Sequence, residues 1–81
     1  MVNIEPFKDW LQENTTYTAA VIRDTGSRIK RADSILEWSD DEVYLFYLER
    51  TEVYKGLSQT VRSQIKKAVK LYWCFRHNQK P

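Results

Sequence analysis

Residues 57–75 read LSQTVRSQIKKAVKLYWCF, the longest regular pattern in this chain of 81 residues. Apolar side chains recur there at the three- and four-residue spacing that gathers them on one face of an α-helix: Leu57, Val61, Ile65, Ala68, Tyr72 and Phe75. Ser58 is a residue type that caps helix N-termini. The pattern predicts an amphipathic helix that runs to about Arg76 and buries this apolar face.

The same segment carries basic side chains roughly opposite the apolar face or on its flank: Arg62, Lys66, Lys67 and Lys70. No acidic residue follows Glu52, so no carboxylate within the helix can neutralise them. The net charge of +2 is the sum of about −5 in the first 52 residues and about +7 in the rest. The positive electrostatic field of the second part attracts polyanions.

Two helices are predicted upstream. The first spans about residues 5–14 and places Phe7, Trp10 and Leu11 on one face. The second spans about residues 18–37, with Thr18 as its N-cap and with an apolar face that consists of Ile22, Thr25, Ile29, Ala32 and Leu36. Gly26 lies on that same face, where glycine costs about 1 kcal/mol relative to alanine. We therefore expect another helix to approach closely at Gly26.

A third helix is predicted between these segments. Ser39-Asp40-Asp41-Glu42 has the pattern of a capping box, and its carboxylates favour the positive end of a helix dipole. The apolar run 43–50 follows, and the helix should fray before Lys55-Gly56. The chain is thus predicted to be an all-α, compact four-helix domain over residues 1–76, with residues 77–81 as a tail or the start of a linker.

Composition narrows the remaining possibilities. Hydrophobic residues make up 42% of the chain, and only two Gly and two Pro occur, which disfavours a turn-rich β fold or disorder. The single Cys74 cannot form an internal disulfide, so we expect a cytoplasmic setting. Charges within the first 15 residues exclude a signal peptide, and no apolar run is long enough to span a membrane.

Catalytic and metal chemistry is not expected. Cys74 and His77 could supply two metal ligands, whereas a structural zinc site needs four. No glycine-rich phosphate loop is present, and no nucleophile, base and orienting group can be assembled from one histidine and one cysteine. We therefore expect no enzymatic activity, no cofactor and no metal site.

A second basic face is predicted on the helix of residues 18–37, formed by Arg23, Lys30 and Arg31. Hydroxyl and amide side chains that can bond phosphates or base edges are interleaved on the two basic faces: Ser27, Ser34, Gln59 and Ser63. Nucleic-acid binding, an ordinary solvated surface and a protein contact all remain compatible with this pattern.

The sequence also resembles a known family. The segments FKDWL (7–11), TTYT (15–18), SRIKRA (27–32) and the helix of residues 57–75 are similar in layout to the N-terminal core-binding domain of tyrosine recombinases, the SAM-like domain of phage integrases. The resemblance covers about residues 5–76. It implies a SAM-like orthogonal bundle.

The resemblance implies a domain that clamps double-stranded DNA, followed by a C-terminal catalytic domain that holds all the catalytic residues. It also implies a multimer on DNA and a role in DNA integration or recombination. The implied contacts come from the second and last helices: Thr18, Arg23, Ser27, Lys30, Arg31, Gln59, Arg62, Ser63, Lys66, Lys67 and Lys70. For these helices to form one DNA-facing surface, the acids of residues 40–42 must point away from it.

An alternative is a protein-interaction module that self-associates, with the acidic region of one copy on the basic helix of another. Docking on an anionic membrane is less compatible with the pattern, because the apolar face of the last helix is needed for the core.

Overall fold

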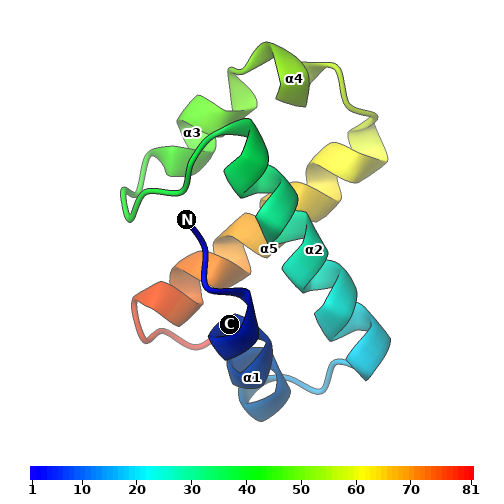
Figure 1. The fold of residues 1–81 in the computed structure, drawn as a ribbon, viewed down its shortest axis with the longest axis vertical. Coiled ribbons are helices and arrows are strands. Elements are labelled where there is room, and N and C mark those ends of the chain that lie inside the picture. Colours follow the sequence, from blue (N-terminus) through cyan, green and yellow to red (C-terminus); the bar gives the residue numbers. More distant parts are fainter.

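The computed structural model describes residues 1–81 and is entirely helical (Figure 1). Its five helices are α1 (Ile4–Asn14), α2 (Ala19–Ile35), α3 (Tyr44–Glu49), α4 (Glu52–Lys55) and α5 (Gln59–Arg76). The all-α prediction is confirmed, with five helices rather than four. None of the helices has the length and apolar character needed to cross a membrane.

The predicted N-caps of the two long helices are confirmed. The Thr18 hydroxyl accepts a hydrogen bond of 3.3 Å from the Val21 N–H, and the Ser58 hydroxyl accepts one of 3.2 Å from the Val61 N–H. Each cap satisfies one of the amide groups that a helix start leaves unpaired. The starts of α2 and α5 are thus set by local sequence.

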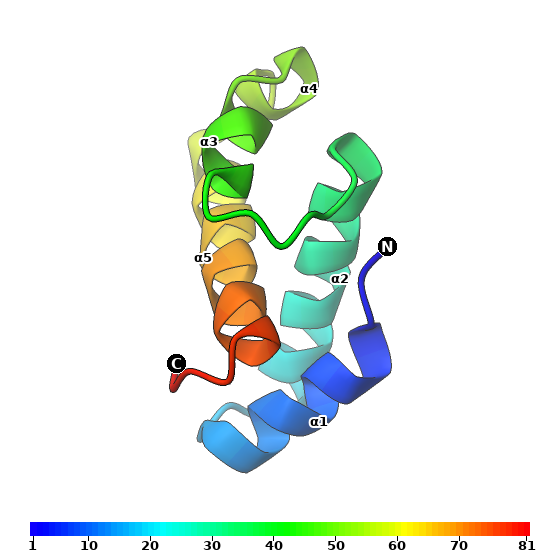
Figure 2. The ribbon, with the colours of Figure 1, turned by 90° about the vertical axis from the view of Figure 1, so that its left-hand side faces the viewer.

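The core lies between α2 and α5, which pack side by side in Figure 2, with α1 crossing at one end. The buried residues of α2 are Ile22, Thr25, Gly26, Ile29 and Ala32, and those of α5 are Ile65, Ala68, Val69, Leu71 and Tyr72. Phe7 and Leu11 of α1 close the core. These are largely the apolar faces that helical periodicity predicts.

Helix α1 approaches α2 closely at Gly26. A Cβ atom at this position would lie 3.3 Å from Ile4 Cγ2 and 3.4 Å from Lys8 Cδ. The contact confirms the expectation that another helix approaches the glycine on the buried face of α2.

Two buried tyrosines tie distant segments to the core. The Tyr44 hydroxyl donates to the carbonyl of Leu36 at 2.6 Å and also lies 3.2 Å from that of Ala32. The Tyr72 hydroxyl accepts a hydrogen bond of 2.9 Å from the Asn3 N–H. The bonds to the Leu36 carbonyl and from the Asn3 N–H satisfy groups at helix ends that the helix itself does not pair, whereas the Ala32 carbonyl also accepts from the Leu36 N–H.

The predicted capping box at residues 39–42 is wrong. Helix α3 starts at Tyr44 after Val43, with no side-chain cap, and Asp41 Oδ1 accepts from the Val43 N–H at 3.1 Å in the preceding turn. The Asp40 carboxylate instead binds Arg76 of α5, 36 residues away. A charge-assisted bond to a guanidinium is stronger than one to a neutral amide, which gives the physical reason.

The predicted third helix is also interrupted. Helix α3 ends at Glu49, and the Thr51 hydroxyl caps a separate turn, α4, by accepting from the Tyr54 N–H at 3.3 Å. Threonine favours this role because its side chain competes for nearby backbone amides. The segment 44–55 therefore changes direction and forms two short helices, which lie toward the end of the molecule opposite α1 (Figure 1).

Candidate nucleic-acid interface

The side of α5 that points away from the core carries a polar and basic surface. Gln59, Ser63, Lys67 and Lys70 are exposed, whereas Arg62 and Lys66 are half-buried. The predicted line Arg62–Lys66–Lys70 is therefore not uniformly open to solvent, because its first two members turn toward the segment that contains α3 and α4.

Arg62 is one of the two half-buried cations. The Tyr54 hydroxyl donates a hydrogen bond of 2.8 Å to the Arg62 carbonyl, and the Arg62 Nε atom is buried without a hydrogen-bond partner. Burial raises the pKa of Tyr54, the nearby Glu49 raises it further, and Arg62 opposes the shift. Arg62, Lys66 and Glu49 line one shallow hollow, so an acid lies close to these two cations.

The basic side chains along the middle of α5 form no ion pair: Arg62, Lys66, Lys67 and Lys70. In contrast, Arg76 at the end of the same helix is paired with Asp40 at 2.7 Å. An unpaired surface cation keeps its full capacity to bind an external anion, since no internal bond must first be broken.

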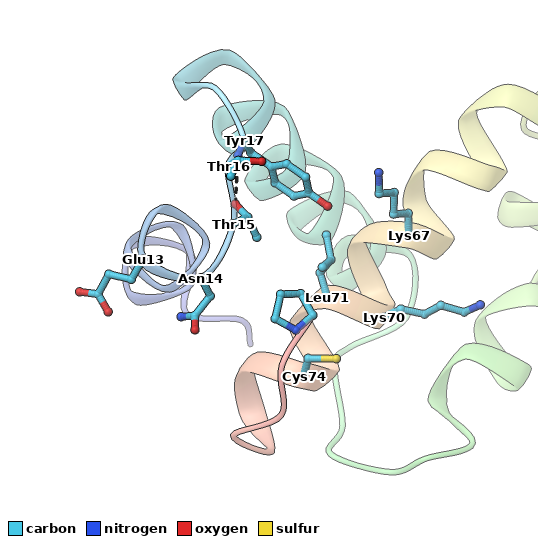
Figure 3. A pocket seen from close by; sticks show the side chains of 10 residues that line it. Glu13, Asn14, Thr15, Thr16, Tyr17, Lys67, Lys70, Leu71 and Cys74 are labelled. Carbon is cyan, nitrogen blue, oxygen red and sulfur yellow. Dashed lines mark hydrogen bonds between the residues drawn. The ribbon is translucent and has the colours of Figure 1, made fainter.

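A broad hollow of about 730 Å³ lies between the α1–α2 loop and α5. Figure 3 shows the Tyr17 ring reaching from the loop toward α5, with the Lys67 side chain beyond it and Lys70 pointing away from the loop. Lys67 Nζ lies 5.4 Å from the Tyr17 ring centroid, within cation–π range. Thr16 adds a hydroxyl donor to the same hollow and Glu13 adds a carboxylate, whereas the Thr15 hydroxyl already donates to the Leu11 carbonyl at 2.6 Å.

The Asp41 and Glu42 side chains lie on the same side of the molecule as Lys70. Together with Trp73 these residues line a second hollow along α5. The expectation that the acids of residues 40–42 all point away from the basic surface is therefore wrong. The α2–α3 loop brings them there because Trp38 and Tyr44, on either side of them, pack against each other and Trp38 packs on Tyr72.

The predicted contacts on α2 occupy a separate surface. Arg23, Ser27, Lys30 and Arg31 are exposed, and Arg23 Nε lies 3.6 Å from the Asp24 carboxylate. Thr18 is exposed but its hydroxyl already caps α2.

The structure does not bring the two basic faces together. Helices α2 and α5 lie side by side (Figure 2) and face each other through their buried residues, so their outward faces lie on opposite sides of the helix pair. No surface hollow is lined by basic residues of both helices. The predicted single DNA-facing surface is thus divided into two surfaces.

Two residues that the sequence did not single out contribute to these surfaces. Arg28 of α2 is half-buried, forms no ion pair and lines a hollow with Ser27 and Arg31. Tyr17 lies beside Lys67, a contact between residues 50 positions apart that periodicity within one helix cannot reveal. Only the hydroxyl-rich TTYT segment pointed toward Tyr17.

The His77 and Cys74 side chains have different surroundings. The His77 ring stacks on Trp73, with centroids 3.7 Å apart, and its Nδ1 atom lies 3.0 Å from the Trp73 carbonyl. Cys74 is half-buried and borders the hollow beside the α1–α2 loop.

No protein-family model, curated protein or solved structure matches this chain. Function is therefore inferred from the residues at the surface and from the layout of the sequence. The outward side of α5 combines more unpaired cations with neighbouring hydroxyl groups than the outward side of α2 does.

Proposed function

We propose that this chain is a non-catalytic domain that binds double-stranded DNA through the outward side of α5 and the adjoining α1–α2 loop. The observation that carries the proposal is the row of α5 cations that form no ion pair, beside the hydroxyl groups of the loop. Regularly spaced cations with few internal partners match a phosphate backbone, whose negative charges are also regularly spaced.

The exposed lysines are the natural phosphate contacts. Lys67 and Lys70 would displace counterions from the duplex, and the hydroxyls of Thr16 and Tyr17 can donate to phosphate oxygens. Such contacts position a duplex without reading its sequence. Arg62 carries the guanidinium of this surface, whose terminal nitrogens can bind a guanine edge in bidentate fashion, whereas its buried Nε atom cannot reach a base.

The finer proposal follows from the resemblance to core-binding domains. The chain would serve a tyrosine recombinase or integrase in the cytoplasm, joined to a C-terminal catalytic domain and assembled as a multimer on DNA. Within this proposal the fold is of the SAM-like type, with α3 and α4 together in place of the third helix. The exposed α2 residues Arg23, Lys30 and Arg31 would then contact a different stretch of backbone from α5.

A salt titration of duplex binding tests the proposal. Two variants remove the same three charges from different surfaces: Lys66→Ala/Lys67→Ala/Lys70→Ala on α5, and Arg23→Ala/Lys30→Ala/Arg31→Ala on α2. We expect the slope of log K against log[salt] to flatten by up to about 2.7 in the α5 variant, since three phosphate contacts of about 0.9 each are removed. The α2 variant should keep most of the slope.

Circular dichroism establishes that both variants fold, so that a loss of binding reports on the surface. Absence of wild-type binding at low salt, or equal slopes for wild type and the α5 variant, would contradict the proposal. An equal decrease of the salt slope in both variants would instead indicate that α2 and α5 both contact DNA, as the resemblance implies.

The alternative of self-association between an acidic and a basic face receives less support. Asp41 and Glu42 lie beside Lys70, and Glu49 lies beside Arg62, within one molecule. The acids that would meet the basic helix of another copy therefore already lie next to that helix within their own molecule.

A further inference from the structure

The outer side of α3 exposes an unusual amount of apolar surface. The exposed fractions are 39% for Val43, 53% for Phe46, 57% for Tyr47 and 61% for Val53 of the adjoining α4. The Phe46 and Tyr47 rings contact each other edge to face, with centroids 5.6 Å apart. Exposed apolar residues that cluster rather than scatter are typical of interaction sites.

This apolar surface has a charge of opposite sign at each end. Glu42 is exposed and directly precedes Val43, whereas Arg50 is exposed and ends α3, with its guanidinium carbon 4.3 Å from the Phe46 ring centroid. Neither charge forms an ion pair within the chain. The order along α3 is therefore acid, apolar residues, base.

A surface with this order is complementary to itself. If two copies meet with their α3 helices antiparallel about a two-fold axis, Glu42 of each copy approaches Arg50 of the other. Phe46 and Tyr47 then lie near the axis, where they cover each other. A closed two-fold contact uses the same residues from both copies, which is what this arrangement provides.

We propose that the outer side of α3 mediates a symmetric dimer of this chain, held by Phe46, Tyr47 and Val43 and oriented by paired Glu42–Arg50 contacts. The apolar area is small compared with the roughly 1,200 Å² of a stable interface, so the dimer is weak and depends on concentration. The contact contains none of the residues proposed to bind DNA. It does not depend on the proposed function, and it meets the outward side of α5 only at the hollow that Glu42 shares with Lys70.

A charge exchange tests both the contact and its symmetry. Sedimentation of the wild type over a wide concentration range should show a monomer–dimer equilibrium. Glu42→Arg and Arg50→Glu, each alone, should shift the chain to monomer, because like charges then meet at both ends. An equimolar mixture of the two variants should associate again, because opposite charges then meet at both ends of the mixed dimer. One end keeps the wild-type Glu42–Arg50 pair, and at the other end the two charges are exchanged between positions 42 and 50.

The substitution Phe46→Ala addresses the apolar part and should weaken association at least tenfold. All these side chains are exposed, so unchanged thermal unfolding at low concentration verifies that folding is intact. A wild type that remains monomeric at every concentration overturns the proposal, as does a mixture that fails to associate. Association lost on replacing Lys67 and Lys70 would assign the contact to α5 and would equally overturn it.

Discussion

Asp40 and Arg76 form a two-point ion pair across the fold. Arg76 Nε lies 3.1 Å from Asp40 Oδ1 and Arg76 Nη2 lies 2.7 Å from Oδ2, while Trp38 Nε1 donates to Oδ1 at 2.9 Å. The hydrogen bond from Arg76, with a further one from Trp38, lowers the pKa of Asp40 to about 2. The pair joins the end of α5 to the α2–α3 loop.

The first prediction concerns the energy of this pair. Both side chains are partly exposed, so solvent weakens their attraction, and a double-mutant cycle with Asp40→Ala and Arg76→Ala should give a coupling of about 0.5–1 kcal/mol. Urea unfolding provides the measurement. The matched control is Glu5 with Lys8 at 3.4 Å, a single-point pair for which the coupling should be close to zero. Equal couplings would contradict a special role for the two-point geometry.

The second prediction is the pH dependence of the same contact. Because the folded pKa of Asp40 is below its ordinary value of 3.8, the folded chain binds this proton less tightly than the unfolded chain. The stabilisation is thus present above about pH 4 and is lost as the pH falls toward 2. The difference in unfolding free energy between wild type and Asp40→Asn should shrink over that window. A difference that stays constant with pH would show that the Asp40 charge does not stabilise the fold.

The third prediction concerns the Tyr44 hydroxyl, which donates to carbonyls at the end of α2. Tyr44→Phe leaves the Leu36 carbonyl without this donor and should cost about 1–3 kcal/mol of unfolding free energy. Tyr47→Phe is the matched control, since the Tyr47 side chain is exposed to solvent. Equal effects of the two substitutions would show that the buried bond contributes little.

The fourth prediction compares the two glycines. A side chain larger than alanine at Gly26 must displace α1, so Gly26→Leu should destabilise the chain by about 1–3 kcal/mol. At Gly56 the backbone angle φ is −78°, and a Cβ atom would meet only ordinary contacts of 3.5 Å or more. Gly56→Ala should therefore stabilise by about 0.4–1 kcal/mol, through the unfolded chain. Thermal unfolding of both variants checks the opposite signs.

The fifth prediction follows from the acid beside Arg62 and Lys66. If α5 contacts phosphates, Glu49→Gln removes a repulsive charge from that surface and should raise duplex affinity several-fold at low salt. Asp9→Asn makes the same change in net charge beside Arg23 of α2 and serves as the control. An equal gain in both variants would indicate a response to net charge alone.

Much of the fold follows from sequence because its signals are local. Ser58 and Thr18 cap the helices that follow them, and the apolar spacing along residues 57–75 identifies the buried face of α5. Gly26 predicted a close helix contact for a similar reason, since a glycine on the buried face of a helix leaves room for a neighbouring helix. Helix periodicity also identified the outward cations Lys67 and Lys70.

The sequence by itself determined which faces are buried and where the long helices begin, because these depend on neighbours within about one helical turn. Only the tertiary structure decided that Asp40 binds Arg76 rather than capping α3, and that Tyr17 meets Lys67. It also decided that the basic faces of α2 and α5 point apart. These outcomes depend on how helices pack against each other, and residues far apart in the chain carry no local signal of that geometry.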